Sequence, residues 1–94
     1  MALIIGSAIG VIWVVEKFRD EVYLTLFGAN LRKIRESKGL SQESLAAKAN
    51  TTLSQVGRIE RGLRAPTILT VVRLALALDT DPAILFDFRN DFEG

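Results

Sequence analysis

Three arginines surround a single glutamate in the stretch TTLSQVGRIERGLR, residues 51–64, and a helix that only filled a core would not need them. The arginines are Arg58, Arg61 and Arg64, and the glutamate is Glu60. A guanidinium group presents several N–H donors in a rigid plane that matches the oxygens of a phosphate group. The residue types in this stretch therefore predict a surface that binds a polyanion.

The distribution of charge along the chain supports this prediction. The 94 residues have a formal net charge of only +1, but residues 28–73 hold nine Lys or Arg against three Glu. Residues 79–94 hold five acidic residues against one arginine. A solvated face is the ordinary explanation of a charge run, but an excess of one sign on this scale favours a polyanionic partner.

The composition leaves few options for catalysis. The chain has no cysteine and no histidine, which excludes disulfides, thiolate zinc sites and histidine general bases. The acidic residues are scattered, and the sequence shows neither a glycine-rich phosphate loop nor metal-ligand spacing. We therefore expect one small domain that is not an enzyme and that holds no metal or cofactor. A domain of this size also benefits from a partner chain.

Capping signals and apolar spacing predict five helices between about residue 19 and residue 87. The first carries an apolar stripe and ends at Gly39, which suits a left-handed cap. The later helices begin at Ser41, Thr52, Thr67 and Asp81. The fourth, ILTVVRLALAL, is apolar over most of its surface, so we expect it to be the central helix. The last should close the core with Ile84, Leu85 and Phe86.

The second and third helices are separated by only about three residues, ANT, and must therefore cross steeply. This is helix-turn-helix geometry. It leaves the polar face of the third helix free to enter a major groove of DNA, and that face carries Leu53, Ser54, Gln55 and Arg58. The neighbouring arginines are then explained, because phosphates line the groove. Glu60 needs another explanation.

The segment LRKIRESKGLSQESLAAKANTTLSQVGRIERGLRAPTILTVVRLALAL resembles the Cro/repressor-type, XRE-like helix-turn-helix family, to which the DNA-binding domain of the lambda repressor belongs. The resemblance covers about residues 27–86 and is strongest in LSQESLA, IERG and the proline that follows. It implies a mainly α, compact five-helix domain that binds double-stranded DNA. It also implies a homodimer that regulates transcription from an inverted-repeat operator in the cytoplasm.

The resemblance also assigns roles to individual residues. It implies phosphate contacts from Gln42, Thr52, Arg61 and Arg64, and base contacts from Leu53, Ser54 and Arg58. The polar face of the third helix adds Gln55 to the predicted base contacts. It implies an internal ion pair between Arg35 and Glu60, which would explain the single acid of the third helix. Alternatively, Gln42 and Thr52 serve only as helix-end residues, and Arg58 and Leu53 are ordinary exposed side chains.

Two positions depart from the family pattern. Leu53 stands where a polar residue that contacts bases is common, so we expect it to meet a thymine methyl group. Gly57 lowers the helix propensity of the third helix by about 1 kcal/mol relative to Ala. We expect that the backbone passes close to DNA or to the second helix there.

Residues 1–15, MALIIGSAIGVIWVV, lie outside the resemblance and contain no charged residue. As a helix they would span only about 22 Å, less than the roughly 30 Å of a bilayer core, and no basic residue precedes them as in a signal peptide. Because Ile and Val dominate, we predict a strand over residues 11–15 that pairs across a dimer axis. A start-codon artefact, with the natural chain beginning near Val15, and a membrane-touching segment are the alternatives.

The predicted organisation has three parts. Residues 1–18 form an apolar extension, residues 19–88 the DNA-binding domain, and residues 89–94 an acidic tail. A different class of function remains open beside DNA binding. In it, the chain is a protein-interaction or membrane-proximal module that keeps the helix-turn-helix fold and uses its apolar N-terminus as the working surface.

Overall fold

The computed structural model describes the backbone of residues 2–88 and the side chains of residues 19–88. The described part contains five helices and no strand: α1 (Ala2–Ser37), α2 (Gln42–Lys48), α3 (Leu53–Glu60), α4 (Ile68–Ala77) and α5 (Pro82–Leu85). The prediction of a mainly helical, five-helix domain is confirmed. The predicted acidic tail, residues 89–94, lies outside the described residues.

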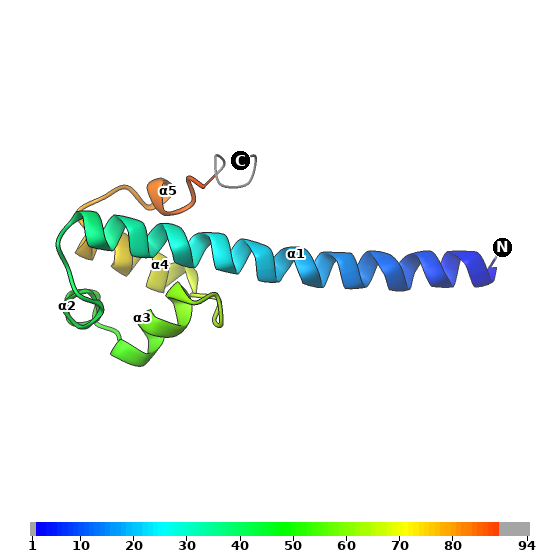
Figure 1. Ribbon diagram of the computed structural model, residues 1–94, viewed down its shortest axis with the longest axis horizontal. Helices are drawn as coiled ribbons and strands as arrows, with labels where there is room; N and C mark the ends of the chain where they lie inside the picture. The colour runs from blue at the N-terminus through cyan, green and yellow to red at the C-terminus, as the bar shows by residue number, and fades with distance from the viewer. Residues whose placement is uncertain (1, 89–94) are drawn as a thin grey trace.

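The predicted strand over residues 11–15 is wrong, because α1 is continuous from Ala2 to Ser37. The first helix was expected to begin near residue 19, and it begins one residue after the initial Met. A helix forms its backbone hydrogen bonds within one segment, whereas an isolated strand leaves its edges unpaired. The N-terminal half of α1 projects beyond the other four helices (Figure 1). The proposed boundary at residue 18 therefore falls inside a helix.

None of the helices in the described part is both long enough and apolar enough to cross a membrane.

Local signals set the ends of the other helices as predicted. Ser41, Thr52, Thr67 and Asp81 are N-caps, and each side chain accepts a hydrogen bond of 2.9–3.1 Å from a backbone N–H two or three residues later. Gly39 follows α1 with φ at +71°, and Gly62 follows α3 with φ at +73°. These two glycines take the left-handed conformation that ends a helix at little steric cost.

The core lies where α1 packs against α3 and α5, and where α2 packs against α3 and α4. Its residues come from all five helices, so the short helices stabilise one another through shared apolar contacts. The fully buried large side chains are Leu31, Leu45, Val56, Ile59, Leu74, Leu78 and Leu85.

At Gly28, α1 comes very close to the end of α3. A Cβ atom at this position would lie 2.6 Å from the carbonyl oxygen of Glu60 and closer still to that of Ile59. These are backbone atoms, so no side-chain rotation could relieve the overlap. The absence of a side chain at Gly28 therefore allows α1 to hold α3 in place.

The expectation that α4 is the central helix is wrong. One face of α4 packs into the core through Val71, Leu74 and Ala75, but the opposite apolar face is open. Ile68 is 83% exposed and Leu76 is 73% exposed. In the last helix only Leu85 is fully buried, while Ile84 and Phe86 stay about half exposed. A domain with so few short helices cannot cover every face of a helix that is apolar all round.

Candidate nucleic-acid interface

α2 and α3 form a helix-turn-helix pair. Residues 49–52 join them, and Asn50 lies in this turn with φ at +54°. The backbone N–H of Thr51 donates to the carbonyl oxygen of Ala46 at 2.9 Å, which closes the end of α2. The two helices cross steeply on one side of α1 (Figure 1). This arrangement presents α3 at the surface of the domain.

α3 has one face in the core and one face in solvent. Val56, Ile59 and Glu60 are buried. On the other face, Ser54 and Arg58 are exposed and Leu53 is 50% exposed. Ser54 and Arg58 lie four residues apart, about one helical turn, and Leu53 precedes Ser54, so the exposed side of α3 carries these residues from its first turn to its last. Gln55 is only half-buried and lies at the edge of this surface.

The residues expected at the phosphates border the same surface. Thr52 is exposed at the start of α3, where its Oγ1 accepts the N–H of Gln55 at 3.1 Å. Arg61 is the C-cap of α3, and Arg64 lies in the segment that leads to α4. Both arginines are exposed. Predicted contact residues therefore occur at both ends of α3, and Arg64 follows three residues after its C-cap.

Arg35 and Glu60 form a buried ion pair between α1 and α3. The Arg35 Nε donates to Glu60 Oε2 at 2.6 Å, and Nη2 donates to Oε1 at 3.0 Å. Nη1 donates to the carbonyl oxygen of Leu40 at 2.8 Å. The hydrogen bond to Glu60 raises the pKa of Arg35 above its ordinary value, against the opposing effect of burial. The guanidinium is therefore always charged, and it holds α1, α3 and the loop before α2 together.

Gln42 reaches this ion pair from the first turn of α2. Its Nε2 donates to Glu60 Oε1 at 2.9 Å, and the residue is half-buried. Its Oε1 lies 3.9 Å from the position that a Cβ of Gly57 would take, and Arg61 Nη2 lies at the same distance from that position. Side chains from α2 and from the end of α3 therefore both approach Gly57.

The sequence alone did not reveal three of these relationships. Gly28 and the Gln42–Glu60 hydrogen bond were missed, as was Asn30, whose Nδ2 donates to the carbonyl oxygens of Ile84 and Leu85 at 2.9 Å. Asn30 was detectable in principle, because it is a polar residue beside the apolar stripe of α1. The other two depend on distances between helices that local spacing does not set.

Comparison with known proteins identifies a helix-turn-helix family match over residues 31–85. The chain is 40% identical over 53 residues to an uncharacterized HTH-type transcriptional regulator, y4dJ, of Sinorhizobium fredii, covering 56% of this chain and 69% of that protein. It is 38% identical over 64 residues to the control protein C.BamHI of Bacillus amyloliquefaciens, covering 67% of this chain and 79% of that protein.

A solved structure agrees with these relatives. The restriction-modification controller protein C.AhdI from Aeromonas hydrophila is 46% identical, with a TM-score of 0.66, and the match covers 67% of this chain and 96% of that chain. These similarities favour a DNA-binding regulator over the protein-interaction or membrane-proximal module. The chain belongs to the helix-turn-helix family, in its Cro/repressor-type branch of DNA-binding transcriptional regulators.

Proposed function

We propose that this protein binds a specific double-stranded operator by inserting α3 into the major groove, and that it does so in the cytoplasm, as a regulator rather than an enzyme. The observation that carries this proposal is the exposed face of α3. It combines Ser54, Leu53 and Arg58 with a border of basic and amide side chains, on a helix held firmly from behind by Gly28 and Arg35. Recognition of base edges requires a rigid helix whose exposed side chains can contact the bases.

In this proposal the residues divide into two groups by position. The exposed residues of α3 itself reach the bases. Leu53 and Ser54 do so from the first turn, because recognition helices in helix-turn-helix proteins contact base edges with their N-terminal residues, and Arg58 does so with its long side chain from one turn after Ser54. Arg58 is the candidate to donate hydrogen bonds to a guanine, and Leu53 is the candidate to contact a thymine methyl group. The residues around the ends of α2 and α3 reach phosphates instead. They are Gln42, Thr52, Arg61 and Arg64.

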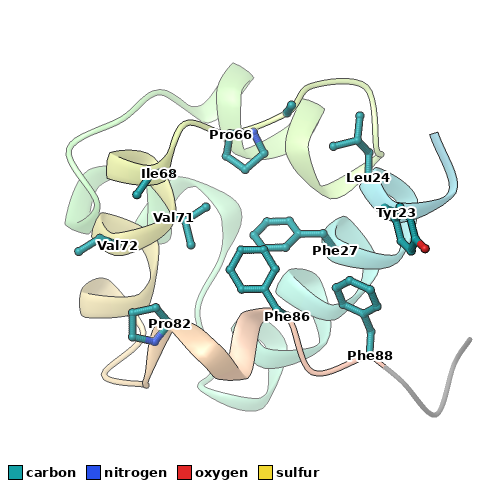
Figure 2. Close-up of a pocket in the computed structure, with 11 residues that line it drawn as sticks. Tyr23, Leu24, Phe27, Pro66, Ile68, Val71, Val72, Pro82, Phe86 and Phe88 are labelled. Atoms are coloured by element: carbon teal, nitrogen blue, oxygen red, sulfur yellow. The ribbon is translucent and has the colours of Figure 1, made fainter. Parts of the chain in front are cut away.

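We further propose that the protein acts as a homodimer, joined through the open apolar face of α4 and α5. A groove of about 490 Å³ lies between α1, α4 and α5. Figure 2 shows Phe27 and Phe86 at its centre, with ring centroids 5.1 Å apart. The exposed Ile68, Leu69, Val72 and Leu76 continue this apolar surface along α4. Patches of this kind on a small domain mark contact with another chain.

A second copy of the chain is the partner that suits this face best. The open face of α4 also carries Arg73, and the acidic residues Asp79 and Asp81 follow α4. A surface with both signs of charge around an apolar centre can pair with itself about a two-fold axis. Two α3 helices related by such an axis would contact two half-sites, which is why we propose an inverted-repeat operator.

The relatives suggest the class of target. C.AhdI from Aeromonas hydrophila is a restriction-modification controller protein, and C.BamHI from Bacillus amyloliquefaciens is a control protein. We propose the same role for this chain, which is the control of genes for a restriction enzyme and its methyltransferase.

The test is selection of bound duplexes from a random pool with the purified full-length protein. We expect enrichment of a sequence with two-fold symmetry, which the protein then binds far more tightly than a scrambled duplex of equal length. Titrations at two salt concentrations should show affinity falling as salt rises, because bound arginines release counterions from the phosphates. Recovery of no common sequence, with equal binding to all duplexes, would contradict the proposal.

A further inference from the structure

The carboxylate of Glu60 has more partners than an ion pair requires. Its Oε2 accepts from Arg35 Nε at 2.6 Å, and its Oε1 accepts from Arg35 Nη2 at 3.0 Å and from Gln42 Nε2 at 2.9 Å. The side chain of Glu60 is only 2% exposed. One carboxylate on α3 therefore binds side chains from both α1 and α2, and Gln42 is the only one of these partners proposed to contact DNA.

This bond restricts a side chain that would otherwise be mobile. A glutamine has several rotatable bonds, and ordering it has an entropic cost when a ligand binds. In the free protein, Glu60 already fixes one N–H of the Gln42 amide. The second N–H of the same nitrogen remains for another acceptor. An anionic acceptor also polarises the amide, which makes the second N–H a better donor.

The charge of Glu60 would normally oppose DNA binding, and Arg35 removes this difficulty. A carboxylate close to a phosphate repels it, because like charges at short distance are unfavourable. Here the guanidinium of Arg35 forms two hydrogen bonds with the carboxylate and neutralises it. Glu60 can therefore accept from Gln42 beside a polyanion without presenting a net negative charge to it.

We infer that Glu60 is a positioning residue, which holds the Gln42 amide ready to donate to a phosphate oxygen of the DNA backbone. The inference rests on the proposed function. The Oε1 of the fixed amide and the Nη2 of Arg61 each lie 3.9 Å from the position that a Cβ of Gly57 would take, so the two side chains approach the same part of α3. A phosphate that accepts the second N–H of Gln42 Nε2, and a phosphate that binds Arg61, would then be held by side chains from α2 and from the end of α3. The buried pair with Arg35 thereby connects the stability of the fold to the geometry of the contact.

A double-mutant cycle on the selected duplex tests this inference. The variants are Glu60→Gln, Gln42→Ala and the two combined, all measured well below their unfolding temperatures. Loss of the acidic group alters the general attraction to DNA equally with or without the Gln42 side chain. Loss of positioning appears only when that side chain is present. We expect Glu60→Gln to reduce affinity roughly three- to tenfold more in the parent background than in the Gln42→Ala background.

Two controls separate positioning from mere stability. Arg35→Lys weakens the same ion pair but keeps the Glu60 carboxylate as the hydrogen-bond acceptor of Gln42. We therefore expect this variant to unfold at a lower temperature, while the Gln42 side chain still contributes to DNA affinity. In the absence of DNA, the side-chain amide resonances of Gln42 should shift in Glu60→Gln and stay close to their parent positions in Arg35→Lys. If Glu60→Gln does not fold, Glu60→Asp serves instead, because it keeps the charge and withdraws the carboxylate by one methylene.

The outcomes distinguish the two proposals. Equal effects of Glu60→Gln in both backgrounds would overturn the positioning role while leaving DNA binding intact. If the parent protein selects no duplex, the proposed function is wrong and the positioning role is lost with it. A coupled loss of affinity, together with the shifted Gln42 resonances, supports both.

Discussion

The side chain of Asn30 in α1 hydrogen bonds to the backbone of Leu85 at the end of α5. The Asn30 Nδ2 donates to the Leu85 carbonyl oxygen at 2.9 Å, and both residues are buried. The same nitrogen donates to Ile84. A single amide thus satisfies the last carbonyls of a four-residue helix that could not persist alone.

Replacing this amide should loosen α5. In Asn30→Ala the Leu85 carbonyl oxygen loses its donor in a buried place and the Ile84 carbonyl oxygen loses one in a partly buried place, which costs about 1–3 kcal/mol. Urea unfolding followed by circular dichroism measures the free energy of unfolding. Ser37→Ala is the control, because its exposed hydroxyl donates to a carbonyl within α1 and its loss should change little. Similar unfolding curves for both variants would show that α5 is held by apolar contacts alone.

The buried ion pair should matter far more for stability than a surface pair. Glu60→Gln leaves the charge of Arg35 buried without a counterion, at a cost on the order of 3 kcal/mol. Glu36→Gln removes the partner of Arg32 in a pair of 3.4 Å whose side chains are 64% and 58% exposed, and should cost under about 0.5 kcal/mol. Thermal unfolding of the two variants provides the comparison. Equal decreases in unfolding temperature for the two variants would mean that burial does not increase the contribution of the Arg35–Glu60 pair to stability.

Two helical glycines should respond to alanine with opposite signs. At Gly57 the nearest atoms to a new Cβ lie 3.9 Å away, which is ordinary contact, so Gly57→Ala should stabilise the protein by about 1 kcal/mol through helix propensity. At Gly28 the new Cβ would overlap backbone atoms of α3, so Gly28→Ala should destabilise it. Calorimetry measures both. Destabilisation by Gly57→Ala would restore the explanation that α2 passes too close for a side chain.

Arg58 and Arg61 should contribute to DNA binding in different ways. We expect Arg58 to contact a base and Arg61 to contact a phosphate. Arg58→Ala should cost roughly 1–3 kcal/mol on the selected duplex and spare binding to a scrambled one. Arg61→Ala and Arg64→Ala should weaken both duplexes alike and reduce the salt dependence by about one counterion each. Titrations of each variant with both duplexes at two salt concentrations test this. Equal losses on both duplexes for Arg58→Ala would make it a phosphate contact.

The open face of α4 should control the oligomeric state. Leu76→Glu places a charge in the proposed dimer contact and should shift the protein to monomers in sedimentation equilibrium while the helical content is unchanged. Leu63→Glu is a matched control, because Leu63 is 71% exposed but precedes α4 in the loop after α3. A dimer that survives Leu76→Glu would place the contact elsewhere.

The sequence predicted those features that depend on a few neighbouring residues. The caps at Ser41, Thr52 and Asp81 could be predicted because a side-chain oxygen satisfies a donor only two or three residues away. Gly39 and Gly62 could be predicted because few other residues accept a positive φ.

Features that depend on distant or absent partners could not be predicted in the same way. The preference of Ile and Val for strands is weak. The part of the chain that the structure describes contains no strand for residues 11–15 to pair with, and these residues belong to α1 instead. The apolar pattern of α4 does not indicate which face meets its own core and which is left open. The bond from Gln42 to Glu60 joins residues 18 positions apart and depends on the crossing of α2 and α3.

The continuity of α1 has a mechanical consequence. At about 1.5 Å per residue, a helix of 36 residues is about 54 Å long, which accounts for most of the 56 Å long dimension of the molecule. α1 has no break between its projecting half and the half that abuts α3 at Gly28. The projecting half is thus a direct extension of the half that packs against α3. A movement of the projecting half would therefore be passed to the end of α3 through unbroken helix, because no loop separates the two halves of α1.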